Sequence, residues 1–77
     1  MPWNYRITYR PKHPLEGYVI REVYYDEEGA VKLYSKDPMS PFGDISEELY
    51  ADMCKMMDAF DKDPLNLDQV DHLMSEA

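Results

Sequence analysis

The segment DPMSPFG, residues 37–43, divides this chain into two halves with different patterns. Proline has no backbone N–H to donate to a β-ladder, so Pro38 and Pro41 are expected to end any sheet that precedes them. Before this segment apolar residues alternate as they do in strands, and after it they recur at the spacing of a helix. We therefore expect strands first and helices second, which is typical of the α+β class.

Three stretches in the first half are predicted to be strands, at about residues 3–10, 18–26 and 30–36. In WNYRITYR one face carries Trp3, Tyr5, Ile7 and Tyr9, the pattern of a half-buried strand. The stretch YVIREVYYD is rich in β-branched and aromatic residues but is mixed on both faces, so its buried face stays open. A hairpin turn at residues 26–29 completes a three-stranded antiparallel meander, with Gly29 supplying a positive φ.

The second half is predicted to form an amphipathic helix at about residues 45–61, packed on the sheet, and a short C-terminal helix at about residues 67–74. One continuous apolar stripe consists of Ile45, Leu49, Met53, Met56 and Phe60. We expect Leu49, Met53 and Met56 to face the sheet, while exposure of the methionine-rich flank stays open. Asp44 or Ser46 is expected to cap the first helix, and Asn66 the second. All these elements are assigned to one domain, residues 1–77.

The charge of this chain is −8 and is unevenly distributed. Residues 1–36 carry six Lys or Arg against five acids, giving +1, whereas residues 37–77 carry two Lys against eleven acids, giving −9. Such a surface repels nucleic-acid phosphates and attracts a protein with a basic surface. The predicted partner-binding residues form an acidic ridge on the first helix and just beyond it: Glu47, Glu48, Asp52, Asp58, Asp61 and Asp63.

No catalytic residue, cofactor or metal site is predicted. The single cysteine, Cys54, excludes an internal disulfide and a cysteine zinc site, and we expect it to be a partly buried packing residue. The stretch that begins at Asp61 matches a calcium loop only at its first and third positions, because Asn66 and His72 replace the required glycine and glutamate. The acidic turn at residues 26–28 is interpreted as a solvated turn.

The function expected from these observations is that of a small acidic non-enzymatic protein-binding module, with its specific role and oligomeric state left open. The N-terminus lacks the apolar region of a signal peptide. No apolar run approaches the roughly 20 residues that span a membrane. We therefore expect a cytoplasmic protein without a membrane or nucleic-acid partner.

Three stretches, WNYRI, REVYYDEEG and SKDPMSPFGDISEEL, resemble a family of small uncharacterised bacterial proteins. That family shares a WNYR start, an EVYYD strand and a P-x-G…EEL helix entry, and the resemblance covers about residues 3–62. It implies a fold and a bacterial source but no activity.

The helix entry is also similar to that of the HicB-type antitoxins, which have a partial ribonuclease-H-like fold. Gly43, Asp44, Glu47, Glu48 and Leu49 match the antitoxin pattern G-D-T-x-E-E-A in arrangement, and Ile45 replaces its threonine. This similarity implies an alternative function, an antitoxin or a nucleic-acid-mimicking inhibitor of a basic protein. A small enzyme is a second alternative, for which no nucleophile, base or metal set is identified.

Overall fold

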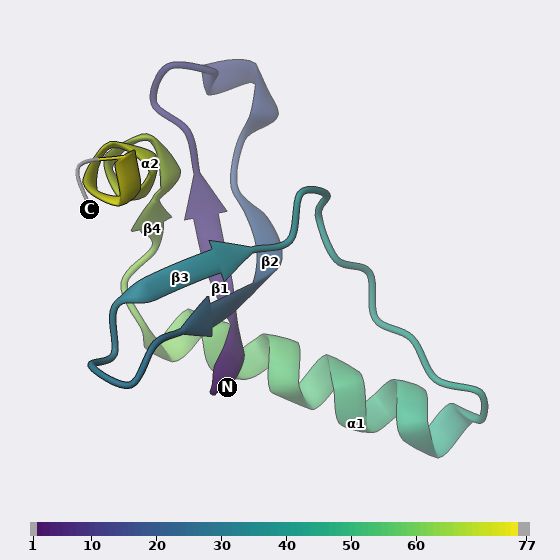
Figure 1. Cartoon of the computed structure of the whole chain (residues 1–77). Coiled ribbons are helices and arrows are strands. Elements are labelled where there is room, and N and C mark those ends of the chain that lie inside the picture. The colour runs from purple at the N-terminus through teal and green to yellow at the C-terminus, as the bar shows by residue number, and fades with distance from the viewer. Residues whose placement is uncertain (1, 76–77) are drawn as a thin grey trace.

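The computed structural model describes residues 2–75, which form a curled four-stranded sheet and two α-helices (Figure 1). The strands are β1 (Trp3–Tyr9), β2 (Val19–Tyr25), β3 (Val31–Tyr34) and β4 (Leu65–Asn66), in the order β3-β2-β1-β4. The α+β class is confirmed, and the antiparallel meander of β1, β2 and β3 is present. The expectation of a three-stranded antiparallel sheet is wrong in one respect, because β4 pairs in parallel with β1 and makes the sheet mixed.

The strand that sequence patterns missed, β4, contains only two residues. Its register sets Thr8 opposite Leu65 and Tyr9 opposite Asn66. A two-residue strand has no alternation to detect, and Pro64 directly before it favours a loop assignment. Through β4, β1 acquires a neighbour on each side and becomes a central strand.

The hairpin between β2 and β3 forms where it is predicted. The Asp26 carboxylate accepts hydrogen bonds from the backbone N–H groups of Glu28 (2.9 Å) and Ala30 (3.0 Å). Gly29 has a φ of 85°, a conformation that favours glycine. The acidic side chain of Asp26 therefore builds the turn by satisfying its backbone donors.

One face of the sheet is covered by α2 (Leu67–Ser75), the C-terminal helix. This helix begins as predicted, because the Asn66 side-chain oxygen accepts a hydrogen bond of 3.1 Å from the Gln69 backbone N–H. The buried side chains on this covered side of the sheet are Thr8, Arg21, Val23, Leu67 and Val70. Of the two faces of β2, the one that bears Arg21 and Val23 is thus the more deeply buried, which settles the open assignment.

Two arginines tie this covered face together. The Arg21 guanidinium donates to the Thr8 hydroxyl (2.7 Å) and to the Glu16 carboxylate (2.5 Å), although Arg21 is only 3% exposed. Arg10 donates to Asp71 of α2 (2.9 Å) and to the Tyr34 hydroxyl of β3 (2.7 Å). The bonds of Arg21 join β2 to β1 and to Glu16, and those of Arg10, the residue after β1, join the end of that strand to α2 and β3. Each arginine can bridge several partners because it carries several donors in a fixed geometry.

The other face of the sheet is covered only in part, by the end of α1 (Ser46–Met57) and the following 3₁₀ helix η2 (Asp58–Asp61). Most of α1 runs outward past the sheet, as Figure 1 shows. The core on this side contains Tyr5, Met56 and Ala59, with Ile7, Ile20 and Met39 packed against it. The predicted helix 45–61 is therefore an α-helix only as far as Met57.

The expectation that Leu49, Met53 and Met56 face the sheet is correct for Met56 alone. Leu49 is 38% exposed and Met53 is 50% exposed. The helix meets β1 along the line Asp52, Met56, Ala59, since the small side chain of Ala59 allows a close approach and Asp52 bonds to the Tyr5 hydroxyl. Only Met56 belongs both to this line and to the predicted stripe.

Two further expectations about burial are wrong for the same reason. Trp3, placed on the buried face of β1, is 41% exposed because the end of α1 covers Tyr5 and leaves Trp3 at the margin. Cys54 is exposed, because it lies on the side of α1 that faces away from the contact line. Because α1 covers this face only in part, more apolar surface is exposed to solvent than the sequence suggests.

The start of α1 also differs from expectation. Its N-cap residue is Ile45, and no side chain caps the helix, so neither Asp44 nor Ser46 does so. Gly43 lies against the first turn so closely that a Cβ atom there would come within 2.6 to 2.7 Å of Glu48. This approach fixes the entry of the chain, and the acids of the first turn, Glu47 and Glu48, favour the helix dipole.

Candidate functional site: the uncovered flank of α1

An apolar flank of α1 and η2 lies uncovered beside the contact line. Met53, Met57 and Phe60 each follow a contact residue by one position, so they share one side of the helical axis. They are 50%, 63% and 63% exposed. Met57 and Phe60 thus keep most of their surface in water, and with Met53 they border one apolar pocket.

The apolar flank borders a small pocket of about 190 Å³. The pocket is lined entirely by apolar residues of α1, η2, β2 and the loop before α1: Ile20, Pro41, Met53, Met56, Met57 and Phe60. Methionine side chains are flexible and polarisable, so such a pocket adapts to the shape of an inserted apolar group. Strand β2, the loop before α1, and the segment of α1 and η2 thus meet at this pocket.

Most of the predicted acidic ridge is exposed to solvent. Glu47, Glu48, Asp58, Asp61 and Asp63 are exposed, and none of their carboxylates forms an ion pair within residues 2–75. Glu47 and Glu48 lie in the first turn of α1, and Asp58 and Asp61 lie in η2. The ridge therefore spans both ends of the element that carries the apolar flank.

Asp52, also predicted to belong to the ridge, has another role in the structure. Its carboxylate accepts hydrogen bonds from the Tyr5 hydroxyl (2.7 Å) and from the Phe42 backbone N–H (2.9 Å). The Tyr5 bond, followed by the Phe42 bond, lowers the pKa of Asp52. Burial, followed by the bond to Asp52, raises the pKa of Tyr5. Asp52 thus fastens α1 to β1 and to the preceding loop.

The Asp52 bonds predict a loss of stability in acid. The folded pKa of Asp52 lies below its ordinary value of 3.8, so this contribution is complete above that value and disappears as pH falls through the folded pKa. We expect Asp52→Asn to flatten the pH dependence of unfolding below about pH 4. Urea unfolding at a series of acidic pH values measures this, with Asp58→Asn as the control. An equal slope for both variants and the unchanged protein would contradict the role of Asp52.

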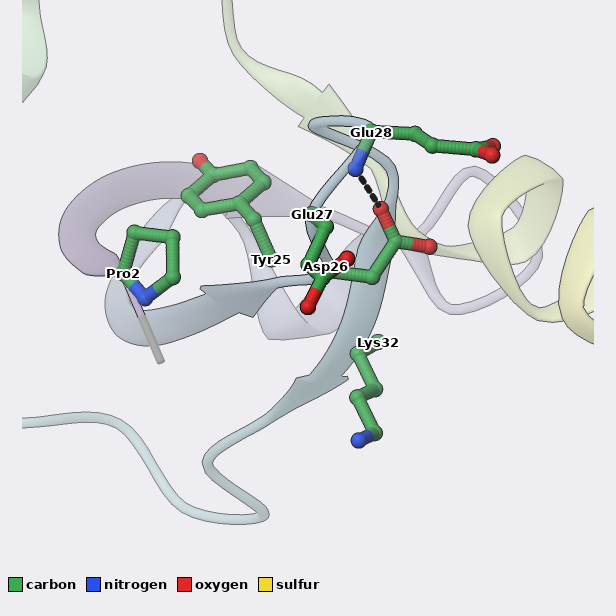
Figure 2. Close-up of a pocket in the computed structure, with 6 residues that line it drawn as sticks. All are labelled: Pro2, Tyr25, Asp26, Glu27, Glu28 and Lys32. Carbon is green, nitrogen blue, oxygen red and sulfur yellow. Dashed lines mark hydrogen bonds between the residues drawn. The ribbon is translucent and has the colours of Figure 1, made fainter.

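A pocket of about 570 Å³ lies at the acidic hairpin turn and does not form a convergent site (Figure 2). Its lining includes Asp26, Glu27, Glu28 and Lys32. Figure 2 shows the Glu28 side chain extending away from Asp26, and the Lys32 side chain pointing to another side. No group of three or more metal-ligating side chains suited to a metal ion occurs among the residues that the structure describes. The cavity is therefore a surface depression beside a turn.

Comparisons with known proteins give no further guidance to this site: no protein-family model, curated protein or solved structure matches this chain. Within residues 2–75, no helix has both the length and the apolar character needed to cross a membrane. Met53 and Phe60 belong to the predicted stripe and Met57 to the methionine-rich flank beside it, and the sequence left the exposure of that flank open. Their exposure follows from the contact of Asp52 and Ala59 with β1. This is a tertiary contact, which local sequence patterns do not predict.

Proposed function

We propose that this chain is a small, acidic, non-enzymatic binding module of the cytoplasm, and that α1 with η2 is its recognition element. The partner is a protein segment that presents apolar side chains flanked by lysine or arginine. The observation that carries this proposal is the apolar flank of Met53, Met57 and Phe60, left in solvent on an otherwise well-formed helix. An inhibitor of a basic toxin or of a nucleic-acid-binding protein is one form that such a module takes.

Charge decides between a basic partner and a second copy of this chain as the occupant of the flank. Residues 37–77 carry −9, and the exposed acids of the ridge lie on the same elements as the flank. Two copies joined through α1 would bring these like charges together, which is unfavourable. A segment with lysine or arginine beside its apolar side chains instead gains attraction from the ridge as its apolar groups enter the methionine-lined pocket.

A designed helical peptide of leucine and lysine tests the proposal directly. We expect it to shift the backbone amide resonances of the apolar flank, while a peptide with glutamate in place of lysine does not. Met57→Gln keeps the charge but removes apolar contact, and should weaken binding about tenfold. Ala51→Gln is the matched control, because Ala51 is exposed on the opposite side of the contact line. Equal binding by both peptides, or by both variants, would contradict the proposal.

The acidic ridge is tested separately through the rate of association. Opposite charges accelerate encounter, and salt screens them over a distance of about 8 Å at physiological ionic strength. We expect Glu47→Lys and Glu48→Lys to slow association with the leucine–lysine peptide and to reduce its salt dependence. Asp52 is left unchanged here because it fastens α1 to β1. A rate that responds to neither salt nor reversal would assign the ridge to solubility alone.

A further inference from the structure

A pocket of about 350 Å³ lies on the opposite flank of α1 from the methionines, between that helix, η2 and the start of β1. Lys55 and Asp58 each precede a contact residue by one position, which places them on this side. The complete lining is Trp3, Asn4, Tyr5, Lys55, Asp58 and Lys62. The pocket thus combines an aromatic wall from β1 with charged side chains from the end of the helix.

Its two lysines are the only cationic residues other than histidine in residues 37–77, yet both line this one pocket. Every ion pair found between residues 2 and 75 is made by Arg10 or Arg21. Within residues 2–75, neither ammonium group therefore forms an ion pair within 4 Å, although the charge of Lys55 acts on the Asp52 carboxylate. Two lysines that line one pocket without forming an ion pair are suited to an anionic ligand.

The aromatic wall is held in place by ring contacts. The indole of Trp3 meets the ring of Tyr5 edge to face at a centroid distance of 5.2 Å, and it lies tilted on Tyr24 at 6.1 Å. Trp3 nevertheless remains 41% exposed. An indole that is held by neighbouring rings and stays accessible to solvent offers a flat surface on which another ring can pack.

We propose that this pocket binds a small aromatic monocarboxylate, with its ring against Trp3 and its carboxylate between Lys55 and Lys62. The volume lies at the small end of the range for ligand pockets, roughly 300–1,000 Å³, which favours a compact molecule. With Asp58 included, the charged groups of the lining sum to +1, so one negative charge balances them and a polyanion is disfavoured. This inference is independent of the protein-binding flank, which lies across the helix.

Three small probes separate the contributions of ring and charge. Benzoate has both, benzamide has the ring without the charge, and acetate has the charge without the ring. The indole N–H resonance reports on the pocket without ambiguity, because Trp3 is the single tryptophan. We expect benzoate to shift this resonance saturably, and benzamide and acetate to bind at least about tenfold more weakly.

Variants of the charged residues test the placement of the carboxylate. Lys55→Met and Lys62→Met should each weaken benzoate binding about two- to fivefold, as expected for a partly solvated ion pair. Asp58→Asn should strengthen it by a similar factor, since a like charge is removed. Lys32→Met is the matched control, because Lys32 lies at the hairpin pocket and the same charge is lost there.

Three results would contradict the inference that this pocket binds an aromatic carboxylate. If benzamide binds as tightly as benzoate, the lysines do not recognise an anion. If benzoate leaves the Trp3 resonance unchanged, the pocket is not a ligand site. If both Lys55→Met and Lys62→Met bind benzoate as Lys32→Met does, the carboxylate is not where we place it. None of these results bears on binding of a basic peptide to the apolar flank.

Discussion

Leu67→Ala is expected to lower the free energy of unfolding by roughly 2–5 kcal/mol, the cost of removing a large side chain from a closed core. Leu67 is fully buried at the first position of α2, directly after β4. A domain of this size has modest stability, so such a loss is a large fraction of the total. Equilibrium unfolding in urea, followed by the signals of the sheet, measures the difference.

Leu49→Ala provides the matched comparison, because it is the same substitution in the other helix. Leu49 is 38% exposed and lies on the outward part of α1, so we expect the midpoint of unfolding to change little. If Leu49→Ala proved as destabilising as Leu67→Ala, α1 would pack on the sheet along more of its length than the structure shows. If neither variant were destabilised, the result would contradict the burial of Leu67 in the core beneath α2.

Ala59→Leu is expected to cost about 1–3 kcal/mol by overpacking the second core. Ala59 is fully buried and meets the same cluster as Tyr5 and Met56. A larger side chain there pushes η2 away from β1 and stretches the bond between Tyr5 and Asp52, which is 2.7 Å long. Unfolding in urea gives the energy, and the hydroxyl and ring resonances of Tyr5 report the separation of the two elements.

Ala51→Leu controls for the introduction of leucine into the same helical segment. Ala51 is exposed, and leucine is a good helix former, so its effect should stay within about 0.5 kcal/mol. A similar loss for both variants would indicate that the substitution disturbs the helix itself. Tolerance of Ala59→Leu would contradict the close contact between η2 and β1.

The parts of the fold that sequence predicted are those determined by neighbouring residues. The hairpin follows from Asp26 and Gly29, and the start of α2 follows from Asn66 and Gln69, all within a few positions of one another. Strand β4 escaped detection because two residues carry no periodicity. The sequence also gave no sign that Arg21 would be buried, since its partner Thr8 lies on another strand.

The candidate site was only half predictable for a related reason. Composition identified the acidic ridge, and spacing identified the apolar residues of α1. Neither determines where a helix touches a sheet, because the contact line depends on which side chains fit β1. Asp52 illustrates this limit: as a charge it matched the ridge, but its bond to Tyr5 makes it part of the attachment of α1.

The parallel pairing of β1 with β4 has a consequence for the order of folding. Thr8 and Leu65 are partners, and 65 − 8 gives a separation of 57 residues. Closing a loop of that length costs on the order of 4 kcal/mol of chain entropy, which a two-residue strand alone does not recover. The β2–β3 hairpin relies on local contacts and forms readily, whereas β4 docks together with Leu67 and Val70. We therefore expect the core beneath α2 to be consolidated late, and its opening to be an early step when the molecule unfolds.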